Sequence, residues 1–117
     1  MGNPIPQEAR NLVELRDFKR CLRCSGKGSE WHHRRSRRVR DEHQHCTCNG
    51  MLLCGTCHRW VHAHPFEARR FGFVVSSHES FPGNVPVLAH FSMITLDCKG
   101  TYEWAPGEGP DTVGPSE

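Results

Sequence analysis

Two Cys-x-x-Cys pairs carry much of the chemistry in this 117-residue chain: Cys21 with Cys24, and Cys54 with Cys57. Two intervening residues let both thiolates of a pair meet one ion, and four thiolates suit tetrahedral zinc. The stretch between the pairs is too long for a simple zinc ribbon, but a hairpin inserted there accommodates it. The alternative is reduced, metal-free cysteines packed in a core, and the paired spacing favours zinc. We therefore predict a structural Zn²⁺ at these four cysteines.

Histidines form the second reactive set. His58 and His62 are four residues apart, so on a helix they share one face and can chelate one ion. His32 and His33 are adjacent, and on a strand their side chains point to opposite sides. One of them can then bind a metal while the other faces a substrate, which suits hydrolysis. A lone histidine is more often structural, but four at these offsets, with Asn49 between the pairs, favour a functional site.

A hairpin and a helix must position these residues. We expect a strand at 30–34, a long basic loop at 35–47 and a returning strand at 50–54. A helix should follow, with Thr56 as a plausible N-cap. Pro65 interrupts that span, so the helix either kinks or ends and a second helix begins with Pro65 at its first position, which we favour.

Flanking elements complete the expected fold. The spacing of apolar residues predicts an amphipathic helix over 7–18, whose stripe packs on the core: Ala9, Leu12, Val13, Leu15 and Phe18. Gly72 should end the helical region. Beyond it lie the β-prone segments 73–76, 85–88, 92–96 and 101–104. Residues 97–100 form a turn between the last two. Pro, Gly, Ser and acidic residues dominate from Ala105 onward, which predicts a disordered tail that can be removed without loss of folding.

The ordered motif Glu30-Trp31-His32-His33, Asn49 and His58-x-x-x-His62, with its cysteine pairs, resembles the HNH family of endonucleases, also called ββα-metal nucleases. The resemblance covers roughly residues 21–72 and is greatest to small HNH proteins encoded by bacteriophages of actinobacteria. It implies a metal-binding hydrolase that acts on DNA.

The resemblance also implies roles for individual residues. By position in HNH nucleases of the colicin DNase type, His32, His58 and His62 would bind the catalytic metal and His33 would be the general base. Asn49 would brace the hairpin and orient His33, and Glu30 matches an acidic residue behind the metal ligands. Other family members carry Asp or Glu where His32 stands. The catalytic ion would be Zn, Ni, Co, Mn or Mg, and three imidazoles suit the first four better than Mg.

The expected fold class is therefore α+β. Residues 1–18 would form an N-terminal segment with a short helix, and 19–72 the HNH nuclease core with its zinc knuckles. Residues 73–104 would form a small β extension, and 105–117 the disordered tail. Only 36% of the residues are hydrophobic, so metal would offset a thin core.

Charge is distributed unevenly along the chain. Between Lys19 and Arg40 there are nine basic residues and one acid, Glu30, whereas the rest of the chain carries six basic and twelve acidic residues. Such a run is often a solvated face, but its place between candidate metal ligands favours contact with a polyanion. We expect five arginines to hold the DNA backbone: Arg34, Arg35, Arg37, Arg38 and Arg40.

A further ligand-rich run is open to several interpretations. His43, His45, Cys46 and Cys48 could bind another zinc, replace a knuckle cysteine or form a polar loop. Their close spacing favours the polar loop, because neighbouring ligands do not easily form a tetrahedron. Cys98 lies in a predicted turn, and we expect it to have no metal role.

The leading hypothesis is a metal-dependent DNA endonuclease in the cytoplasm, or in the host cytoplasm if the chain is phage-encoded. No apolar run is long enough to span a bilayer, and the N-terminus does not resemble a signal peptide. The alternative is a non-catalytic, zinc-stabilised nucleic-acid-binding module, for example an accessory factor in phage DNA packaging. A purely structural zinc protein is third. Phage packaging or replication proteins are possible partners.

Overall fold

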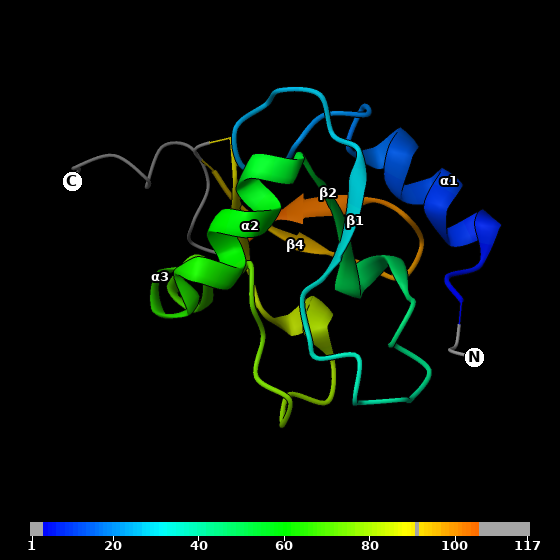
Figure 1. Cartoon of the computed structure of the whole chain (residues 1–117). Helices are drawn as coiled ribbons and strands as arrows, with labels where there is room; N and C mark the ends of the chain where they lie inside the picture. The colour runs from blue at the N-terminus through cyan, green and yellow to red at the C-terminus, as the bar shows by residue number, and fades with distance from the viewer. Residues whose placement is uncertain (1–3, 91, 106–117) are drawn as a thin grey trace.

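The computed structural model describes residues 4–90 and 92–105, which form a small α+β fold (Figure 1). Its centre is an antiparallel hairpin of β1 (Glu30–His33) and β2 (Gly50–Leu53), in which Glu30 lies opposite Leu53 and His33 opposite Gly50. All four residues of β2 are buried. Gly50 is needed here because a Cβ at this position would lie 2.0 Å from the ring of Trp31. The predicted hairpin is confirmed to within a residue at each end.

Two helices follow the hairpin without a gap in the chain. Helix α2 spans Gly55–Ala63 and α3 spans Pro65–Arg70, so the prediction that Pro65 begins a second helix is confirmed. The expected N-cap is wrong, because Cys54 rather than Thr56 caps α2. The chain leaves β2 in an extended conformation at Cys54, and its Sγ accepts a hydrogen bond from the Cys57 N–H at 3.3 Å. Gly72, with φ of +84°, follows the end of α3.

Helix α1 (Gln7–Arg16) packs on the other side of the hairpin from α2 (Figure 1). Its Val13 is fully buried in a small cluster with Trp31, as predicted. Leu15 and Phe18, however, are 73% and 75% exposed, so the expected stripe is only partly correct. The helix ends at Arg16 and Phe18 has a positive φ of 56°, which takes Phe18 off the helical face.

A buried ion pair occupies the end of α1 where apolar side chains were expected. Arg16 Nε donates to Asp17 Oδ1 at 2.7 Å, and both side chains are about 1% exposed. Arg16 also donates to the carbonyls of Thr47 and Gly50, while Asp17 Oδ2 accepts from the Leu52 N–H. These bonds attach α1 to both ends of β2.

A second sheet lies behind the hairpin in Figure 1, with strand order β3–β4–β5 and all pairs antiparallel. Its strands are β3 (Val87–Ala89), β4 (Ser92–Leu96) and β5 (Tyr102–Trp104). The main core lies between this sheet, β2 and α2. The predicted strand at 73–76 is absent from the described structure, where a single parallel bridge joins Val75 to Arg35. This segment pairs with a loop, which offers no neighbouring strand to extend the ladder.

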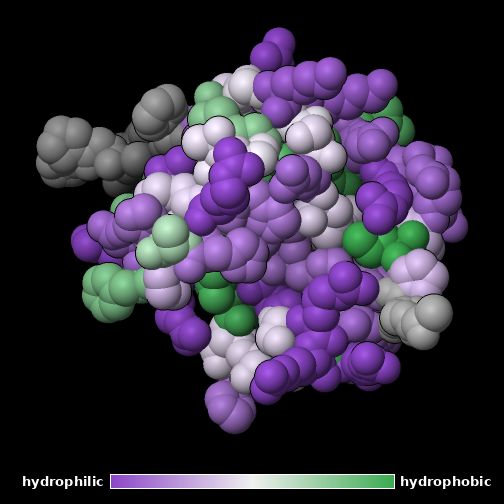
Figure 2. All heavy atoms as spheres, viewed as in Figure 1, coloured by the Kyte–Doolittle hydropathy of each residue, from purple (hydrophilic) through white to green (hydrophobic). Residues whose placement is uncertain are grey.

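Short 3-10 turns at Thr47–Asn49 and Pro82–Asn84 complete the elements. Ala105, the first residue of the predicted tail, is buried, and its N–H bonds to the Met93 carbonyl, so it belongs to the fold. The remainder of that predicted tail, 106–117, lies outside the described residues. None of the described helices is long and apolar enough to span a membrane. The face seen in Figure 2 is mostly hydrophilic, with small, separate hydrophobic patches.

Candidate metal centre

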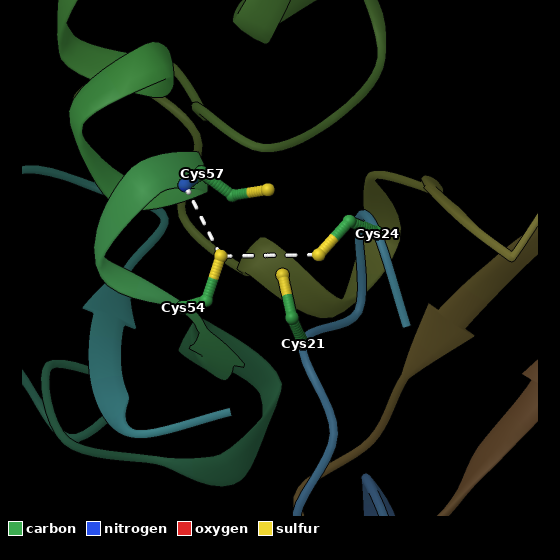
Figure 3. A group of neighbouring side chains, drawn as sticks. All are labelled: Cys21, Cys24, Cys54 and Cys57. Carbon is green, nitrogen blue, oxygen red and sulfur yellow. Dashed lines mark hydrogen bonds between the residues drawn. The ribbon is translucent and has the colours of Figure 1, made fainter. Parts of the chain in front are cut away.

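The four predicted knuckle cysteines meet at one point. Cys21 and Cys24 come from the turn before β1, Cys54 from the end of β2 and Cys57 from the first turn of α2, and their side chains converge (Figure 3). All four sulfurs lie within 4.8 Å of one another, and those of Cys24 and Cys54 are 3.8 Å apart. Zn–S bonds of about 2.3 Å in a tetrahedron place sulfurs about 3.8 Å apart. The cluster could therefore hold a structural metal such as zinc.

The surroundings of the thiols differ. A hydrogen bond from the Cys57 N–H lowers the pKa of Cys54 to about 7, whereas burial raises the pKa of Cys57 to about 12. Arg23 Nη1 donates to Cys57 Sγ at 3.3 Å, and its guanidinium lies 3.7 Å from the centre of the Trp60 ring. A fixed cation beside the cluster stabilises thiolate charge. Sequence analysis missed this role of Arg23, although its place between Cys21 and Cys24 was the available signal.

A second group contains the three histidines predicted to bind the catalytic metal. His32 comes from β1, and His58 and His62 come from α2, one helical turn apart. One ring nitrogen of each lies within 4.8 Å of the others, so the three imidazoles could share an ion. His32 is 3% exposed, and burial lowers its pKa to about 3, which keeps it neutral at pH 7. A neutral imidazole is the form that binds a metal.

Hydrogen bonds determine which ring nitrogens are free. His32 Nε2 lies 2.6 Å from the Phe73 carbonyl, which can only accept, so Nε2 carries a proton and Nδ1 remains available. His58 Nδ1 lies 2.7 Å from Glu30 Oε1, which leaves Nε2 available. A carboxylate or carbonyl that holds the far nitrogen of a histidine orients its ring toward a metal. Glu30 thus contacts His58, one of the three grouped histidines, and its place behind a metal ligand stays a prediction.

His33, the predicted general base, is half-buried beside this group but is not part of it. Burial, together with the nearby charge of Arg37, lowers its pKa to about 4, so its ring is neutral at pH 7 and able to accept a proton. Its Nε2 lies 3.0 Å from His45 Nδ1. This partner was missed, because His45 is twelve positions away in the loop and no local pattern joins the two residues.

Asn49 closes the loop between the strands. It is 1% exposed, its Oδ1 accepts from the Arg35 N–H at 2.8 Å, and its Nδ2 donates to the Gln44 carbonyl at 2.9 Å. These bonds join the two ends of the loop, which agrees with the expected bracing role. Both hydrogen bonds join the Asn49 side chain to backbone atoms of the loop, and neither reaches an imidazole. Asn49 could therefore orient His33 only indirectly, through the loop that carries His45.

A pocket of about 630 Å³ opens over the histidines. All four of His32, His33, His58 and His62 line it, and so do the exposed residues Arg37 and Arg69. No Asp or Glu occurs among the described residues of its lining. Such a surface favours an anionic ligand. Arg69 was missed by sequence analysis because it lies on α3, outside the basic run.

Two of the five arginines predicted to hold DNA lie in the interior. Arg34 and Arg35 are each 1% exposed, so their guanidinium groups are not available to a phosphate backbone. Arg34 instead donates to four carbonyls, which come from three separate segments, and Arg35 binds Asp41 and two carbonyls of a distant loop. Both arginines hold loops together. Arg37, Arg38 and Arg40 are exposed and remain predicted phosphate contacts.

Replacing Arg34 with methionine should lower the free energy of unfolding by at least about 3 kcal/mol, because it leaves several buried carbonyls without a donor. The matched change Arg38→Met, on an exposed side chain, should alter it by roughly 0.5 kcal/mol or less. Urea titrations of both variants measure the difference. Equal stabilities would contradict the structural role given to Arg34.

Comparison with known proteins identifies no family for this chain. No family model matches it, and searches of curated proteins and solved structures found no match.

Proposed function

We propose that this protein is a metal-dependent endonuclease that hydrolyses DNA phosphodiester bonds. The observation that carries the proposal is the group formed by His32, His58 and His62 in one pocket, with a fourth, neutral histidine beside it. Three convergent imidazoles are a donor set for a divalent ion, and phosphodiester hydrolysis needs a base next to that ion. The motif order supports the same reaction by its resemblance to HNH nucleases.

Each of these residues has a separate role in the proposed hydrolysis. A divalent ion held by His32, His58 and His62 would supply positive charge to the scissile phosphate and to the leaving 3′ oxygen. His33 takes the proton from the attacking water at Nδ1, the nitrogen that is not against His45. Glu30 keeps His58 oriented through their 2.7 Å hydrogen bond.

Exposed arginines around the pocket would hold the DNA. Arg37 and Arg69 line the pocket, and Arg38 and Arg40 lie nearby in the sequence. Contacts to phosphate position a nuclease but carry little sequence information. Cleavage should therefore show little sequence preference and weaken steeply with salt.

Nicking of supercoiled plasmid, with and without chelator, tests the proposal. We expect nicking by the parent protein, loss of nicking in a mild chelator that leaves the structural zinc bound, and recovery when a divalent metal is added back. His62→Ala, which removes one ligand of this group, is the matched variant and should not nick. If the protein binds DNA but does not cut it with any divalent metal added, the endonuclease proposal is refuted.

A second candidate is a zinc-stabilised nucleic-acid-binding module without catalysis, such as an accessory factor in phage DNA packaging. The four-cysteine group and the exposed arginines would serve it equally well. It gives no role to a base beside a metal group, so the plasmid assay separates the two functions.

The metal requirement gives a further prediction. Three imidazoles prefer Zn, Ni, Co or Mn to Mg, which favours oxygen ligands. Protein that keeps its structural zinc but has lost the ion at the histidine group should therefore cleave faster with Mn²⁺ or Co²⁺ than with Mg²⁺ at equal concentration. Full activity with Mg²⁺ alone would show that His32 or His62 is not a ligand.

A further inference from the structure

A third group of possible ligands lies away from both sites described above. It contains His43, Cys46 and Cys48 from the loop and turn before β2, and Cys98 from the turn between β4 and β5. The ligand atoms of all four lie within 4.8 Å of one another. Sequence spacing had favoured a polar loop and no metal role for Cys98. That argument considered only neighbouring residues, whereas the fold brings the fourth ligand from a distant turn.

The distances within this group suit a tetrahedral ion. His43 Nδ1 lies 3.7 Å from Cys48 Sγ and 3.9 Å from Cys98 Sγ. A zinc ion bound at about 2.3 Å from sulfur and about 2.0–2.1 Å from nitrogen separates such atoms by about 3.6 Å. One imidazole and three thiolates are a common structural zinc set.

We propose that His43, Cys46, Cys48 and Cys98 bind a second structural zinc ion, independently of the four-cysteine site. The seven cysteines of the chain are then all ligands, four in one site and three in the other. The odd number of cysteines, which does not suit a set of disulfides, is accounted for because His43 completes the second site.

The backbone presents these ligands in an ordered way. Asp97 Oδ1 accepts from the N–H groups of Lys99 and Thr101, each at 2.9 Å, which shapes the turn that carries Cys98. Thr47 Oγ1 donates to the Asp97 carbonyl at 2.7 Å and so joins this turn to the segment with Cys46 and Cys48. The two ligand-bearing segments are therefore in contact without any ion.

The ring of His43 is also held in place. It lies against Phe81, with ring centres 5.0 Å apart, and its backbone N–H donates to Asp41 Oδ1 at 2.9 Å. A ligand with few rotamers left loses little entropy when it binds an ion.

The consequence is a cross-link between the loop and the second sheet. Loop closure by a metal constrains the unfolded chain and orders the loop. His45 stands between His43 and Cys46 in the sequence and contacts His33, so the ion would hold His45 in position whether or not the chain cleaves DNA.

Metal counting on full-length variants tests the second zinc. Zinc per chain, measured by inductively coupled plasma mass spectrometry after gel filtration, should fall by one equivalent in Cys98→Ser and in His43→Ala. The control His78→Ala removes an exposed histidine that belongs to none of the three groups and should keep the parent's zinc. Equal zinc in the parent and Cys98→Ser would overturn the proposal.

Thiol alkylation of the unmodified protein provides a test that needs no variant. All seven cysteines, including exposed Cys98, should resist iodoacetamide in the native protein and react after chelation. Rapid alkylation of Cys46, Cys48 and Cys98 while the other four stay protected would overturn the second site. A disulfide between any two of these three cysteines, detected by intact mass, would do the same.

Discussion

Replacing His33 with alanine should slow DNA cleavage by about 10²–10⁴-fold, the usual loss when a general base is removed. His33 lines the pocket but lies outside the group of three histidines, so its loss removes no ligand. Because its side chain is only half-buried, the fold should survive. Affinity for DNA should also survive, since phosphate contacts come from exposed arginines such as Arg37.

The measurement is a paired one on the same preparation, cleavage rate and DNA binding, with zinc content and melting temperature as checks. His78→Ala, an exposed histidine outside the pocket, is the control and should behave as the parent does. If His33→Ala cuts DNA at the parent's rate, the assignment of roles is wrong and the binding module gains support. If both affinity and zinc content fall with the rate, His33 is structural.

Cys57→Ala should leave the chain largely unfolded at 25 °C. Structural zinc contributes about 10–16 kcal/mol of apparent binding free energy in small domains, which matches or exceeds the 5–15 kcal/mol by which domains of this kind are stable. Cys57 is also 3% exposed, so alanine leaves a gap in the main core. Strong chelator should produce the same result in the parent protein.

Far-UV circular dichroism and metal analysis check this prediction together. His62→Ala is the matched control, because it removes one ligand of the histidine group from the exposed face of the same helix. It should keep its helical signal and its structural zinc. If the parent protein contains no zinc and its melting temperature is unchanged in chelator, the prediction of a zinc site at the four cysteines is refuted.

Local spacing was sufficient for the parts of this protein that local geometry controls. Two residues between cysteines let two thiols meet one ion, and the four-residue offset from His58 to His62 places both histidines on one side of a helix. Proline has no backbone donor, which restricts Pro65 to the first turn of a helix. The four-cysteine group, the group of three histidines, the hairpin and the break between α2 and α3 were predictable for these reasons.

Tertiary structure decided the contacts between residues that lie far apart in the sequence. In the sequence, Arg34 belongs to a basic run that we expected to contact DNA. In the structure its guanidinium donates to four backbone carbonyls far away in the sequence, and only the packed chain supplies those acceptors. His45 meets His33, and Cys98 meets His43, across gaps that no short pattern spans. A single sequence records residue types and their intervals, so it shows which side chains can bind an ion or a phosphate. Which of them are buried, and which meet, follows from how loops pack against sheets.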